Sequence, residues 1–122
     1  MLRLALFQPD IPQNAGTMMR MAACLGIGID IVEPAGFDAS DRNLRRAGMD
    51  YLADLDLRRH VDFAAFETWR RGACRRLVLA TTRSARPYTD FAFAADDVVM
   101  VGRESAGVPD RVHDAADARL LV

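Results

Sequence analysis

The chain has 122 residues, of which 51% are hydrophobic and 27% are charged, and its formal net charge is −1. This length fits one domain with a single core, and the hydrophobic share excludes a disordered chain. The near-zero charge excludes a general polyanion binder, and no apolar run reaches the ~20 residues of a membrane span.

Apolar runs and helix signals alternate along the chain, with Asn14 as the expected N-cap of the first helix and Gly26 as its stop. Strands are predicted at Leu2–Phe7, Gly28–Val32, Leu52–Leu57, Leu77–Thr81, Val98–Val101 and Leu120–Val122, and helices at Ala15–Leu25, Arg42–Ala47, Asp62–Arg71 and Asp110–Ala115. The third strand is more polar than the others and is expected near an edge. This alternation predicts an α/β fold, in which helices cover both faces of a mostly parallel sheet.

Several common kinds of site find no support in the sequence. His60 and His113 lack a second ligand at metal-binding spacing, so we expect no metal. Cys24 and Cys74 have no CxxC partner, and we expect both to be reduced, packed in helices and in a cytoplasmic protein. There is no P-loop, no dinucleotide-binding GxGxxG after the first strand and no nucleophile elbow.

Two polar loops follow predicted strands. The first leads into Asn14-x-Gly16-x-x-x-Arg20, and the second is the run from Gly102 to Pro109, which contains Glu104. Ligands bind at the carboxyl ends of strands in open α/β sheets, so both loops are candidate binding segments. Arg20 alone would be interpreted as an exposed helical arginine, whereas Asn14 and Gly16 beside it favour a functional role.

All 16 basic residues are arginines, and one cluster lies on a predicted short helix. Arg42, Arg45 and Arg46 fall near one helix face, with Tyr51 close behind. Arginine binds phosphate bidentately and stacks on bases, so this cluster could bind RNA, or it could be a solvated helix face. Tyr51 is interpreted as a core residue, with base stacking as the alternative.

These segments resemble the SPOUT (α/β-knot) RNA ribose 2′-O-methyltransferases, and among them the small TrmL-like group that methylates the wobble ribose of tRNA. The resemblance covers residues 1 to 122. Its most specific block is the run from Leu44 to Tyr51, Leu-Arg-Arg-Ala-Gly-Met-Asp-Tyr. The other matching segments are Gln8–Arg20, Ile31–Phe37 and Gly102–Pro109.

The resemblance implies a homodimer that methylates the tRNA anticodon loop with S-adenosylmethionine, bound in a C-terminal trefoil knot. Three strand ends would build the cofactor site, and they match Ala80 and Thr81, Gly102 with Glu104, and Val122. The family's third motif has no counterpart here. We therefore expect residues 1–122 to be a single domain whose knot and C-terminal cofactor segment are incomplete.

The resemblance also implies a catalytic role for Arg20, with Asn14 and Glu104 beside it. A guanidinium has a pKa above ~12 and is a poor base, so we expect Arg20 to orient a phosphate and stabilise the developing alkoxide. Asn14 would position Arg20 or the ribose, and Glu104 would hold either side chain in place. The alternatives are a methyltransferase acting on another tRNA or rRNA site, and a non-catalytic RNA-binding or dimerisation module.

Overall fold

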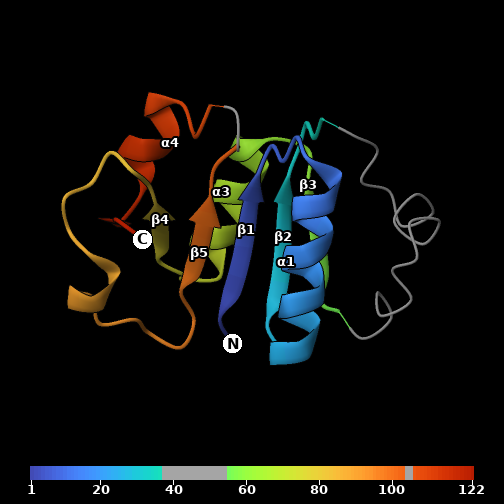
Figure 1. Cartoon of the computed structure of the whole chain (residues 1–122), viewed down its shortest axis with the longest axis horizontal. Helices are drawn as coiled ribbons and strands as arrows, with labels where there is room; N and C mark the ends of the chain where they lie inside the picture. Colours follow the sequence, from blue (N-terminus) through green and yellow to red (C-terminus); the bar gives the residue numbers. More distant parts are fainter. Residues whose placement is uncertain (37–54, 104–105) are drawn as a thin grey trace.

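A computed structural model describes residues 1–36, 55–103 and 106–122. At its centre is a six-stranded sheet in the order β3-β2-β1-β5-β4-β6, in which all neighbouring strands are parallel (Figure 1). The strands are β1 (Arg3–Phe7), β2 (Gly28–Val32), β3 (Leu57–His60), β4 (Leu77–Ala80), β5 (Val98–Val101) and β6 (Ala118–Leu120). The predicted parallel sheet is confirmed.

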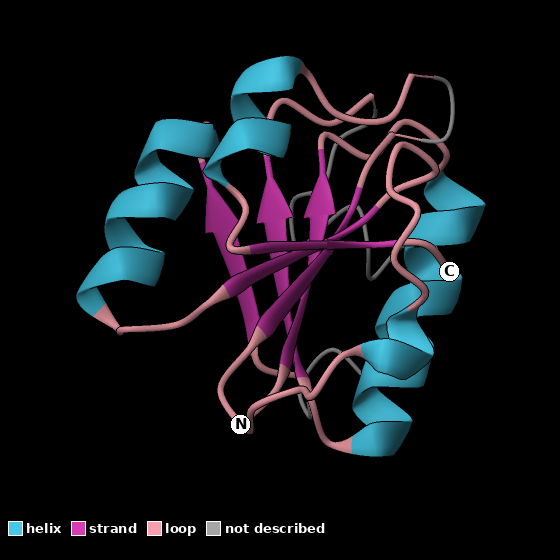
Figure 2. Cartoon of the chain, turned by 90° about the vertical axis from the view of Figure 1, so that its left-hand side faces the viewer, coloured by secondary structure: helices cyan, strands magenta, loops and turns pink. Residues whose placement is uncertain are grey.

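Helices cover both faces of this sheet (Figure 2). On one face, α1 (Pro12–Leu25) packs Met19 against Ile29 and Ile31 of β2. On the other face, α3 (Phe63–Gly72) and α4 (Asp110–Ala115) contribute large apolar side chains to a second core cluster. Because β1 and β2 are buried along their whole length, their near-continuous apolar sequence is what a two-sided sheet requires. None of the described helices is long and apolar enough to cross a membrane.

The first helix begins three residues earlier than predicted. Ile11 is its N-cap and makes no side-chain capping bond, while Pro12 occupies the first turn, where a missing N–H costs nothing. Asn14 lies inside that turn, so its prediction as N-cap is wrong. Gly26 does end the helix, with a φ of 68° that glycine adopts without strain.

Two strand predictions were shifted along the chain. The third strand is Leu57–His60 instead of Leu52–Leu57, and of the predicted range only Leu55 to Leu57 lies within the described residues. Its position at the sheet edge is confirmed. The last strand is Ala118–Leu120, two residues before the predicted start, and it forms the opposite edge beside β4.

A buried polar network joins β1, β2 and β3. Arg3 donates from Nε to Asp30 Oδ2 at 2.6 Å and from Nη1 to Asp56 Oδ2 at 2.5 Å. His60 Nε2 lies 2.8 Å from Asp30 Oδ1, and Asp30 itself is fully buried. Because Asp30 satisfies both Arg3 and His60, its charge contributes to fixing the edge strand β3 against β2. The sequence did not reveal this network, since Arg3 and Asp30 are only interruptions of apolar strands, and His60 is only the last residue of a polar one, until the strands are paired.

Both cysteines are free, but neither is packed as predicted. Cys24 lies on the exposed side of α1, and Cys74 follows α3 with a φ of 56°. The prediction that both lie packed in helices is therefore wrong.

Candidate functional site

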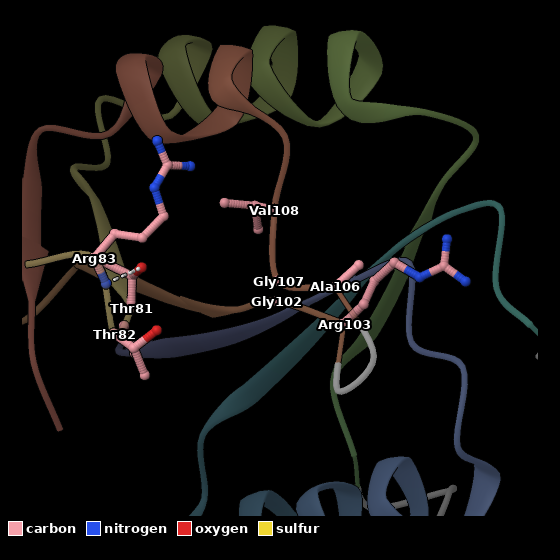
Figure 3. A pocket seen from close by; sticks show the side chains of 9 residues that line it. Thr81, Thr82, Arg83, Gly102, Arg103, Ala106, Gly107 and Val108 are labelled. Carbon is pink, nitrogen blue, oxygen red and sulfur yellow. Dashed lines mark hydrogen bonds between the residues drawn. The ribbon is translucent and has the colours of Figure 1, made fainter.

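A pocket of about 380 Å³ opens at the carboxyl ends of β4 and β5 (Figure 3). This is the edge of a parallel sheet where open α/β folds bind their ligands. It is formed by the segments that follow the two strands, and its lining residues are Ala80, Thr81, Thr82, Arg83, Gly102, Arg103, Ala106, Gly107 and Val108.

One wall of the pocket is a tightly folded segment after β5. Arg103 N donates to Gly107 O at 3.0 Å, and Gly107 N donates back to Arg103 O at 2.8 Å. A Cβ atom at Gly102 would lie 2.7 Å from the carbonyl carbon of Gly107, closer than real Cβ contacts. Gly107 has a φ of 65°. Both glycines are thus required by the backbone geometry of this wall.

The opposite wall is the turn after β4. Arg83 N donates to Thr81 Oγ1 at 3.1 Å, and Thr81 N donates to Leu120 O at 2.8 Å, which ties the turn to β6. The Arg83 side chain extends towards α4 and pairs with Asp110 at 2.9 Å. Both partners of this ion pair are largely exposed, so it contributes little stability.

Three of the residues predicted to bind the cofactor line this pocket together: Ala80, Thr81 and Gly102. Val122 does not, because it lies at a separate apolar pocket of about 270 Å³ beside Leu120. Glu104 lies outside the described residues. The pocket thus brings together two of the three predicted strand ends.

Of the residues predicted to be catalytic or to face RNA, the two that the structure describes lie outside the pocket. Asn14 and Arg20 are exposed on α1, six residues apart, which is about 9 Å along the helix axis. Neither lines the pocket. Arg42, Arg45, Arg46 and Tyr51 lie outside the described residues.

The segments after β1, β2 and β5 meet next to the pocket. Arg103 Nη2 lies 3.7 Å from Asp10 Oδ2 of the β1–α1 loop. Gly36, after β2, donates from its N–H to Pro9 O at 2.8 Å, and a Cβ at Gly36 would lie 2.8 Å from the Cα of Asp10. Our sequence analysis identified both polar loops but missed Asp10 and Arg103. Asp10 and Arg103 carry opposite charges and follow β1 and β5, which are neighbouring strands. That combination was the signal that could have found them.

Comparison with known proteins decides the family. The model of the SpoU rRNA methylase family matches residues 1–122. The chain belongs to this family. The SpoU family match agrees with the SPOUT resemblance of the sequence and with the parallel α/β sheet.

Curated relatives cover nearly the whole chain. It is 60% identical over 119 residues to a protein of Beijerinckia indica and 61% identical over 121 residues to one of Ancylobacter novellus. Both are named tRNA (cytidine(34)-2′-O)-methyltransferase. The matches cover 98% and 99% of this chain, and 74% and 77% of those proteins.

Solved structures share the fold. One, described as "Structural insights into the 2-OH methylation of C/U34 on tRNA", superposes with a TM-score of 0.87 at 38% identity, over 100% of this chain and 80% of that one. An AdoMet-bound rRNA methyltransferase from Sinorhizobium meliloti gives a TM-score of 0.85 at 26% identity, over 99% of this chain and 46% of that one.

Proposed function

We propose that this protein is an S-adenosylmethionine-dependent tRNA methyltransferase that modifies the ribose 2′-hydroxyl of nucleotide 34, a cytidine or uridine. One observation carries the proposal above all others. Relatives with this name are 60% and 61% identical to the chain over almost its entire length. The pocket after β4 and β5 supplies a place for a small ligand at the expected edge of the sheet.

We propose that S-adenosylmethionine occupies this pocket. Its volume of about 380 Å³ lies within the range of small-ligand sites. Gly102 and Gly107 carry no side chain at their two positions in the wall, and Thr81 adds a hydroxyl among the backbone groups. The AdoMet-bound relative with the same fold supports the assignment. When bound, this cofactor supplies an electrophilic methyl group on a sulfonium.

The 2′-hydroxyl must lose its proton as its oxygen bonds to the methyl carbon and the sulfur–carbon bond breaks. We propose that Arg20 holds the neighbouring phosphate and stabilises negative charge on the 2′-oxygen, with phosphate accepting the proton. Its exposure on α1 leaves it accessible to RNA. Asn14 would position Arg20 or the ribose, and Glu104 would fix this arrangement. A guanidinium stays protonated at neutral pH, so it supplies positive charge and cannot act as a base.

We further propose that Arg42, Arg45, Arg46 and Tyr51 contact the anticodon loop and that the protein is a homodimer. Support for the dimer comes from α1, where Met21 and Leu25 are 46% and 67% exposed. Apolar side chains exposed in a group are typical of an interface. The mass in solution tests this directly, because a dimer has twice the 13.5 kDa of the chain.

Calorimetric titration with S-adenosylmethionine, followed by a methyl-transfer assay on tRNA, tests the proposal. We expect Arg20→Ala to lose methyl transfer while its cofactor affinity stays within about twofold of the wild type, because Arg20 lies outside the pocket lining. Equal activity in the variant would remove Arg20 from the mechanism. Absence of cofactor binding at millimolar concentration would contradict the enzyme assignment and favour a non-catalytic RNA-binding module.

A further inference from the structure

Arg103 has fewer partners among the described residues than Arg70 and Arg76 have. Arg70 makes four side-chain hydrogen bonds between 2.6 and 3.1 Å, and Arg76 makes two to Asp97 and one to Ala92 O. Within the described residues, the guanidinium of Arg103 has only the 3.7 Å contact with Asp10. Its Nε is buried without an acceptor. A buried donor without an acceptor costs free energy of folding, so this placement of Arg103 does not stabilise the fold.

The direction of the Arg103 side chain indicates which ligand group it can reach. Figure 3 shows it leaving the pocket wall on the side away from Thr81 and Thr82. It ends beside Asp10, in the loop between β1 and the helix that carries Arg20. The guanidinium therefore lies beside the β1–α1 loop, and not over the threonines of the pocket. Its side chain is 37% exposed, whereas that of Asp10 is 16% exposed.

We propose that Arg103 binds a backbone phosphate of the RNA substrate at the border between the cofactor pocket and α1. The inference rests on the proposed function, and it deepens that function by assigning this residue a substrate group. A guanidinium offers five donors in a planar fork that matches a phosphate, and within the described part of the chain the 3.7 Å contact with Asp10 leaves most of them available. The carboxylate of Asp10 lies close enough to keep the guanidinium at this border between ligand-binding events.

The alternative oxyanion is the carboxylate of the cofactor. Two observations favour the phosphate: the side chain turns away from the threonines of the pocket, and its ionic partner Asp10 belongs to the β1–α1 loop. A phosphate there would lie beside the loop that leads from β1 into α1. The two sources of negative charge predict different results in binding experiments.

The test measures tRNA affinity against salt concentration for the wild type and R103Q, with cofactor affinity measured in parallel. Each phosphate contact contributes about 0.7 to 0.9 to the slope of log K against log salt. R103Q should lower the steepness by that amount and weaken tRNA binding roughly four- to fivefold at 0.15 M salt. Cofactor affinity should stay within about twofold. R103K keeps the charge and should retain the wild-type slope.

Arg71 provides the matched control. Its side chain is 71% exposed and pairs with Glu67. It lies near the end of α3, at the end of the sheet where β4 begins and not at the end where the pocket opens. R71Q removes the same charge and should leave the slope unchanged. The proposal is overturned if R103Q matches the wild-type slope, or if it weakens the cofactor instead of tRNA. In both cases the proposed function stands, whereas a wild-type protein that binds no tRNA would contradict the two together.

Discussion

Gly102→Ala should disrupt the proposed cofactor pocket through one added methyl group. The new Cβ would lie 2.7 Å from the carbonyl carbon and 2.8 Å from the Cα of Gly107. Both are backbone atoms, so no side-chain rotation relieves the contact. Gly102 itself has no left-handed φ, and the steric contact is therefore the only obstacle to alanine.

The size of the effect follows from the required movement. An ordinary contact begins at 3.4 Å, so Gly107 must retreat by about 0.7 Å, the difference from 2.7 Å. That movement stretches the two hydrogen bonds, now 3.0 and 2.8 Å, that close the segment from Arg103 to Gly107. Losing them and overpacking the loop should cost about 2 to 3 kcal/mol. If half of this free energy is lost from cofactor binding, the affinity for the cofactor falls roughly tenfold.

Isothermal calorimetry with S-adenosylmethionine measures this loss, and thermal unfolding reports on the fold. Gly72→Ala is the matched control, because a Cβ there meets nothing within 4 Å at the end of α3. The control should bind cofactor as the wild type does and should be equally stable or slightly more so. Unchanged affinity in Gly102→Ala would refute the assignment of this wall to the cofactor site.

Two further predictions concern buried charges. Arg3→Met should lower the free energy of unfolding by about 3 to 5 kcal/mol in urea titration, because among the described residues the fully buried Asp30 then keeps only His60 as a side-chain partner. A cost below about 1 kcal/mol would contradict this. The hydrogen bonds from Arg76 lower the pKa of Asp97, so its ionised form stabilises the fold at neutral pH, and this contribution is lost as pH falls below about 4. Asp97→Asn should therefore be less stable by about 2 kcal/mol at pH 7, with the difference narrowing in acid; a constant difference across pH would contradict the assignment.

Apolar patterning was sufficient to predict the sheet, because β1, β2 and β5 are buried runs bounded by polar residues. It was insufficient for β3, whose Leu57–His60 segment has two exposed arginines and a histidine. That strand is positioned by Asp30, which bonds His60 across the sheet, and by Arg3, which reaches Asp56. Long-range pairing of charged residues has no local sequence signal, so the prediction placed the strand on the more apolar residues before it.

The candidate site was predicted in outline. The family resemblance implied that Ala80, Thr81 and Gly102 lie at strand ends around one ligand, and the pocket is lined by all three. The contact between Asp10 and Arg103 was not foreseen, since it depends on the side-by-side placement of β1 and β5. Which loops touch depends on the pairing of strands that are far apart in the sequence. A single sequence therefore shows the loops more readily than the contacts between them.

The most direct test of the central claim is to incubate tRNA with the protein and S-adenosylmethionine and to locate the methyl group by mass spectrometry of nuclease fragments. The account predicts one added methyl group on the 2′-oxygen of nucleotide 34, and none with Arg20→Ala. A methyl group on a base, or on the ribose of another nucleotide, would contradict it. So would unmodified tRNA recovered from a protein that demonstrably binds both the cofactor and the tRNA.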